Sequence, residues 1–110
     1  MPVVTTRILE YRYELRSTPD ENVALAYLLG EADRLVAMVA CVEGTAALPG
    51  PRENVSGVVM LTLRRGDFAD LVGMLRNEKP LYFSWSRDAQ VATLSTRDEP
   101  TGEAEPWWSR

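Results

Sequence analysis

Hydrophobic and polar residues alternate without a break over residues 8–16, and a period of two is typical of a β-strand with one buried face. The apolar positions that share one side are Leu9, Tyr11, Tyr13 and Leu15. The opposite side carries Ile8 and then charges of alternating sign: Glu10, Arg12, Glu14 and Arg16. We therefore expect a half-buried antiparallel strand whose solvent-facing side forms cross-strand ion pairs.

Residues 18–33 fit two interpretations. The segment Thr18-Pro19-Asp20-Glu21 has the form of a capping box with proline at the first helical position. The apolar residues that follow have helical spacing, and they are Leu25, Leu28, Leu29 and Ala32. In the alternative, residues 18–22 are a polar turn and residues 23–29 are a strand. We favour a helix over residues 19–30 because the cap and the periodicity agree.

The rest of the chain predicts strands on either side of one clear helix. Residues 35–42 are rich in valine and predict a buried strand, and residues 44–54 form a loop around Pro49-Gly50-Pro51. Residues 57–64 are the next strand. Asp67 is a good N-cap for the helix that follows, and Pro80 ends it. The apolar stripe of this helix is Phe68, Leu71, Val72 and Leu75. Residues 81–85 and 90–96 are two strands joined by a turn.

This order of elements predicts an α+β fold, in which an antiparallel sheet carries one or two helices on one face. With a helix at residues 19–30, the order becomes a ferredoxin-like βαββαβ arrangement plus an extra C-terminal strand. Without that helix, the order is a β-meander, a helix and a β-hairpin. The length of 110 residues is that of one domain, which we assign to residues 1–97, followed by an acidic, proline-containing tail at 98–110.

The residue types that are missing restrict the chemistry. The chain has no histidine, and Cys41 is its single cysteine. Histidine triads, histidine-bearing zinc sites and intrachain disulfides are therefore excluded. Cys41 has no basic residue within six positions, so we expect it to act as a small buried hydrophobe. We predict no catalytic residue, no metal site and no cofactor, and an enzyme is the less favoured class.

Charge and hydropathy bear on partners and location. The net charge of −4 comes mostly from the tail, which leaves the rest of the chain close to balance. That balance gives no general attraction to nucleic acid or to an anionic membrane. No apolar run approaches the roughly 18 residues of a membrane-spanning helix, and residues 1–7 lack the pattern of a secretory signal. We expect a cytoplasmic protein without a membrane partner.

One strand has a composition seen in proteins that bind single-stranded nucleic acid. Such proteins stack bases on aromatic side chains of a sheet and contact phosphates through arginine. The segment 81–86 is rich in aromatic residues, and arginines lie in nearby segments. The candidate residues for such a surface are Tyr82, Trp85, Arg64 and Arg87. Tyr82 is expected on the opposite strand face from Trp85, and core packing is the favoured role of Trp85.

The tail combines acidic residues with a terminal aromatic pair. Its candidate partner-binding residues are Glu103, Glu105, Trp107 and Trp108. Docking of the two tryptophans back on the same domain is the other interpretation, and it is the favoured one for the tryptophans. In composition it resembles the acidic C-terminal tails of bacterial single-stranded-DNA-binding proteins, a resemblance that implies partner recruitment and covers the tail alone. It differs from that pattern because Ser109 and Arg110 follow the tryptophans.

The leading hypothesis is a small non-enzymatic module or complex subunit that works through protein contacts and self-associates, as a homodimer for example. Exposed sheet edges in so small a domain favour such contacts. One alternative is a single-stranded nucleic-acid-binding protein whose acidic tail docks partners. A second alternative is a dimeric ferredoxin-like domain that binds a small ligand or acts as an enzyme.

Overall fold

The computed structural model describes residues 3–20, 22–43 and 47–96. The strands that precede the helix are β1 (Val4–Ile8), β2 (Glu10–Ser17), β3 (Asn22–Leu29), β4 (Leu35–Cys41), β5 (Arg52–Glu53) and β6 (Val59–Leu63). A short 3₁₀ turn, η1 (Glu31–Asp33), joins β3 to β4. The helix is α1 (Arg65–Asn77), and the strands after it are β7 (Leu81–Ser86) and β8 (Val91–Ser95).

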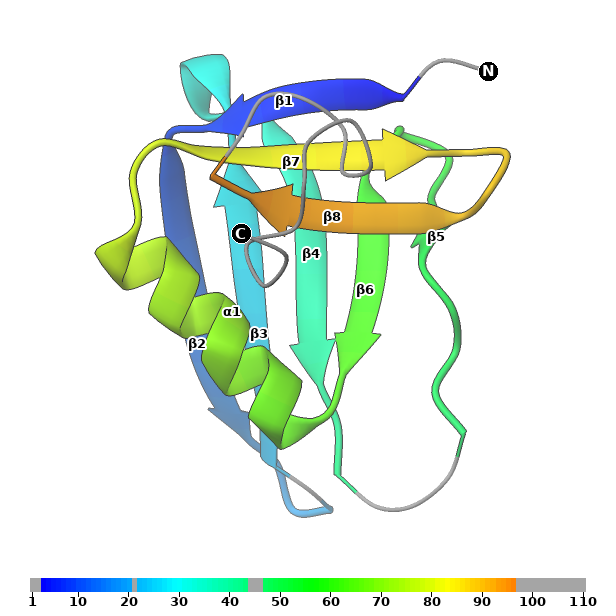
Figure 1. Cartoon of the computed structure of the whole chain (residues 1–110). Coiled ribbons are helices and arrows are strands. Elements are labelled where there is room, and N and C mark those ends of the chain that lie inside the picture. The colour runs from blue at the N-terminus through cyan, green and yellow to red at the C-terminus, as the bar shows by residue number, and fades with distance from the viewer. Residues whose placement is uncertain (1–2, 21, 44–46, 97–110) are drawn as a thin grey trace, which may run out of the picture.

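The strands form two sheets. The larger sheet has the order β2-β3-β4-β6-β5, and the smaller sheet has the order β1-β7-β8. Neighbouring strands are antiparallel except β4 and β6, which run parallel. Figure 1 shows α1 and the smaller sheet on the same side of the larger sheet. The predicted α+β class, with mainly antiparallel strands and a helix on one face, is confirmed.

The predicted strand at residues 8–16 is interrupted at Leu9. Residues before the break belong to the smaller sheet, where Ile8 pairs with Leu81, and residues after it belong to the larger sheet, where Glu10 pairs with Leu29. Of the predicted inward residues, Tyr11 packs against the core, whereas the exposed fractions are 48% for Leu9, 47% for Tyr13 and 77% for Leu15. The alternation groups the residues correctly within β2 but not across the break, because Ile8, predicted on the polar side, lies in the core. The apolar side of β2 is covered only in part because β2 is an edge strand.

The helix predicted at residues 19–30 is wrong, and the ferredoxin-like order that depended on it is not observed. These residues contain β3, which pairs with β2 on one side and with β4 on the other. An N-terminal cap contributes about 1 kcal/mol to a helix. Two cross-strand ladders and the complete burial of Ala26 and Leu28 outweigh that contribution. The observed order is closer to the meander–helix–hairpin alternative, from which it differs because β6 runs parallel to β4.

The predicted apolar stripe of α1 is confirmed. Leu71 and Leu75 are buried in the core, and Phe68 and Val72 pack against it. The helix begins at Arg65 with Arg64 at the N-cap position, so Asp67 lies in the first turn. A negative charge there is favourable because the first turn presents unpaired backbone N–H groups.

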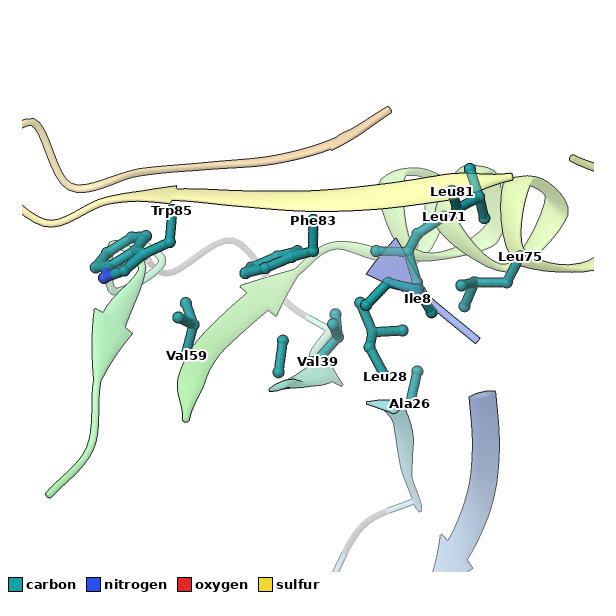
Figure 2. Close-up of a cluster of buried hydrophobic side chains, with 11 residues drawn as sticks. Ile8, Ala26, Leu28, Val39, Val59, Leu71, Leu75, Leu81, Phe83 and Trp85 are labelled. Carbon is teal, nitrogen blue, oxygen red and sulfur yellow. The ribbon is translucent and has the colours of Figure 1, made fainter. Parts of the chain in front are cut away.

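The hydrophobic core lies between the larger sheet and the layer formed by α1 and β1-β7-β8. Figure 2 shows Phe83 and Trp85 pointing from β7 toward the larger sheet, where Val39 and Val59 face them. Phe83 is 2% exposed and Trp85 is 7% exposed. In the part of the chain that the structure describes, no helix is long and apolar enough to cross a membrane.

Candidate interaction surface

The register of the larger sheet assigns its residues to two faces, because directly paired residues share a face and neighbours along a strand alternate. The inner face packs against α1 and the smaller sheet. Its central row pairs Tyr13 with Ala26, Ala26 with Val39, and Val39 with Leu61. Ala26 and Val39 are fully buried in this row.

The outer face of the larger sheet carries two rows of side chains that run across the strands. The first row, which we call the large row, contains Arg12, Tyr27, Met38, Met60 and Arg52 in register. The second row, two residues further along each strand, contains smaller residues and is called the small row. Its members are Glu14, Leu25, Ala40 and Thr62.

The large row and the small row are not part of the hydrophobic core. The six residues that β3, β4 and β6 contribute to the two rows are all half-buried, and none of them packs against the core cluster. Figure 1 shows α1 and the smaller sheet on the inner side. Among the described residues, no helix or strand covers the outer side, so six mainly apolar side chains border solvent there.

Charge on the outer face is confined to its edges. In the two rows, β3, β4 and β6 contribute no ionisable acid or base, apart from the phenol of Tyr27. The edge strand β2 carries Arg12, Glu14 and Arg16, and β5 carries Arg52. Within β2, the Nε and Nη2 atoms of Arg16 donate hydrogen bonds of 3.0 and 2.6 Å to Oε2 of Glu14. The face therefore has an apolar centre and a rim that contains both signs of charge.

A second polar cluster joins the larger sheet to β7. Glu53 on β5 accepts a 2.9 Å hydrogen bond from Nε1 of Trp85 and two hydrogen bonds of 2.9 Å from Nε and Nη2 of Arg87. The hydrogen bonds from Arg87 and then from Trp85 hold the pKa of Glu53 below its ordinary value. Both carboxylate oxygens accept hydrogen bonds from the chain, so we assign this cluster a structural role, tying β5 to the smaller sheet.

The structure does not bring the four predicted nucleic-acid contacts onto one surface. Trp85 lies in the core, and Arg87 is paired with Glu53. Tyr82 lies on the opposite face of β7, next to Ser84, whose hydroxyl is 3.0 Å from Oγ1 of Thr5. Arg64 is half-buried at the start of α1. Nucleic-acid binding stays a prediction that this placement does not favour.

The other candidate groups give no catalytic arrangement within the described residues. Cys41 is half-buried on the inner side of β4, between Ala24 and Leu63 in register. Among residues 3–20, 22–43 and 47–96, no group of three or more Cys, Asp or Glu side chains is placed to hold a metal ion. The tail residues Glu103, Glu105, Trp107 and Trp108 lie outside the described residues.

Sequence reasoning missed the outer face, although a signal for it was present. Strands buried on both sides read as continuous apolar runs, whereas strands with one wet face alternate. The strands β3 and β4 read NVALAYLL and LVAMVAC, with almost no polar residue on either side. Once residues 22–29 are recognised as a strand, these two runs indicate that both faces of the sheet centre are apolar.

Comparison of the chain with protein-family models, with curated proteins and with solved structures gives no match.

Proposed function

We propose that this protein is a small non-enzymatic interaction module and that the outer face of its larger sheet is the surface that binds protein. The observation that carries the proposal is the uncovered apolar centre of β3, β4 and β6. Contiguous exposed apolar surface on a small domain is a common mark of a protein contact site.

The composition of the face fits a protein partner better than a small ligand or a nucleic acid. Protein interfaces combine an apolar centre, enriched in Tyr and Met, with a polar rim that includes Arg. Tyr27, Met38 and Met60 supply such a centre, and Arg12 and Glu14 supply part of the rim. A small ligand needs a concave site that encloses most of its surface. The hollow beside Arg12, Tyr27 and Leu29 on this face is more open than enclosed.

The tail is a second proposed contact. Two tryptophans next to acidic residues are costly to leave in water, so Trp107 and Trp108 are proposed to dock on a partner. Deletion of residues 99–110 should leave the fold intact and reduce partner capture. Unchanged capture by the shortened chain would remove the tail from the proposal and leave the outer face in it.

Site-specific photo-cross-linking in living cells tests the outer face. A benzophenone amino acid replaces Tyr27, and the matched control places it at Val91, which is 51% exposed on β8 of the smaller sheet. The proposal predicts covalent protein adducts from position 27 and few from position 91. Equal yields at the two positions, or no adduct at position 27, would contradict it.

A further inference from the structure

From the pattern of the outer face, we infer that its partner is a second copy of this chain, packed face to face about a two-fold axis perpendicular to the strands. The inference rests on the proposed function and names the partner for the same surface. In this arrangement the large row of each copy lies over the small row of the other.

Steric fit between the two rows favours this arrangement. The two-fold axis lies in the interface, crosses the strands and passes between the two rows. It therefore places each strand over the same strand of the other copy. It sets Tyr27 over the partner's Leu25, Met38 over the partner's Ala40, and Met60 over the partner's Thr62. Each larger side chain then meets a smaller one. Packed sheets about 10 Å apart need such interdigitation, because two large side chains at one point collide and two small ones leave a void.

Charge complementarity favours the same arrangement and involves a different set of residues, on β2. The same axis sets Arg12 over the partner's Glu14, and Glu10 over the partner's Arg16. The outward-facing charges along β2 follow the order Glu, Arg, Glu, Arg. When this order is laid against its own reverse, each glutamate faces an arginine. A two-fold interface requires this property, since the same patch must serve both copies. An unrelated partner requires no such order.

A rotation about an axis parallel to the strands is disfavoured by the same residues. That rotation would place β3 over the partner's β6 and β2 over the partner's β5, since β4 is the central strand. Tyr27 would then face the partner's Met60 within the large row, and Arg12 would face the partner's Arg52. Large side chains would collide and like charges would meet, at a cost in free energy.

The available area fits a modest dimer. Five strands about 4.8 Å apart, with about seven residues of 3.3 Å in the longer strands, span roughly 20 by 20 Å. Two such faces give roughly 800 Å² in projection, and the relief of the side chains raises the accessible area toward the roughly 1,200 Å² at the lower end of specific interfaces. We therefore expect dissociation on dilution into the micromolar range.

Mass by light scattering, measured from micromolar to submillimolar concentration, is the first test. The full chain should be dimeric at the high end, Met38→Glu should be monomeric throughout, and the matched control Val91→Glu should remain dimeric. A wild-type chain that is monomeric at every concentration would overturn the inference. A dimer that persists in Met38→Glu would also overturn it, because the contact would then lie elsewhere. Circular dichroism confirms that each variant is folded.

Charge exchange on β2 tests the orientation and does not depend on the folding of Met38→Glu. Arg12→Glu and Glu14→Arg should each raise the dissociation constant about two- to five-fold, the range for partly exposed ion pairs. The double variant should return close to the wild-type value, because opposite charges again meet across the axis. If the two single effects add in the double variant, the proposed orientation is wrong.

The outcomes separate this inference from the proposed function. A monomeric chain that still gives adducts with other proteins from position 27 would overturn the second-copy inference and leave the proposed function standing. A monomeric chain without such adducts would overturn both.

Discussion

The two faces of the larger sheet are built by the same strands but differ in what lies against them. On the inner face, Leu28 and Val39 are fully buried under α1 and the smaller sheet. On the outer face, the neighbouring residues Tyr27 and Met38 are half-buried and border solvent. The inner apolar residues stabilise the fold, whereas the outer ones lie outside the core and are those that we propose bind a partner.

The largest effect is expected at the centre of the inner face. Leu28→Ala removes a side chain with no exposed surface and should lower the free energy of unfolding by about 2–5 kcal/mol. Chemical denaturation measures this loss. A loss below about 1 kcal/mol would mean that the inner face is not the packed side of the sheet.

The second test concerns the layer that covers the inner face. Glu53 has a pKa below its ordinary value in the folded chain, so its contacts stabilise the fold above the ordinary glutamate range. This contribution is lost as the pH falls through the lowered pKa. Wild type should therefore melt at a higher temperature than Glu53→Gln at neutral pH, and the difference should shrink in acid.

The matched control for Glu53, measured in dilute solution where the chain is monomeric, is Glu14→Gln, which removes the same charge from an ion pair within one strand. It should change the melting temperature less than Glu53→Gln does at neutral pH. If the difference between wild type and Glu53→Gln does not vary with pH, the ion pair does not tie β5 to β7.

A smaller effect on the fold is expected one residue away from Leu28. Tyr27→Ala should lower the free energy of unfolding of the dilute monomer by less than about 1 kcal/mol, because the ring lies outside the core. Denaturation at low protein concentration measures the contribution of Tyr27 to the fold, and denaturation at high concentration also measures its contribution to association. The second-copy inference predicts that the deficit grows at high concentration, where the wild type gains stability by self-association. A deficit as large as that of Leu28→Ala in dilute solution would place Tyr27 in the core.

The smallest effect is expected at the edge of the inner face. Leu15 is 77% exposed on β2, so Leu15→Lys should change the free energy of unfolding by no more than about 0.5 kcal/mol. Thermal unfolding provides the measurement. A clear loss of stability would show that the inner core extends to this edge, as the alternation over residues 8–16 predicted.

Local patterns predicted much of the secondary structure. The apolar stripe with Phe68, Leu71 and Leu75 identified α1, and its burial is confirmed because helical periodicity and core contact coincide there. The strands at residues 35–42, 57–64, 81–85 and 90–96 were also found, within a few residues, as β4, β6, β7 and β8.

The errors arose where tertiary pairing outweighs local preference. At residues 19–30 a good cap favoured a helix, but two neighbouring strands supply ladders that only an extended chain can accept. At Leu9 the chain passes from one sheet to the other, and alternation alone gives no sign of such a transition.

Prediction of the outer face requires the correct order and pairing of the strands. The rows exist only because β3, β4 and β6 are adjacent, and the parallel pairing of β4 with β6 joins segments that are separated by 17 residues of the chain. Without that register, Met38 and Met60 are two isolated methionines. With it, they stand side by side in one row.

Methionine oxidation footprinting tests most directly whether a bound protein shields the outer face from solvent. Met38 and Met60 lie on that face, whereas Met74 lies on α1 against the core and serves as the internal reference. Oxidation rates are compared between the protein in its own cells and the purified chain in dilute solution. The account predicts that Met38 and Met60 are protected in cells and react faster on dilution, while Met74 changes little. Equal rates for Met38 and Met60 in both settings would contradict the claim that a protein covers this face.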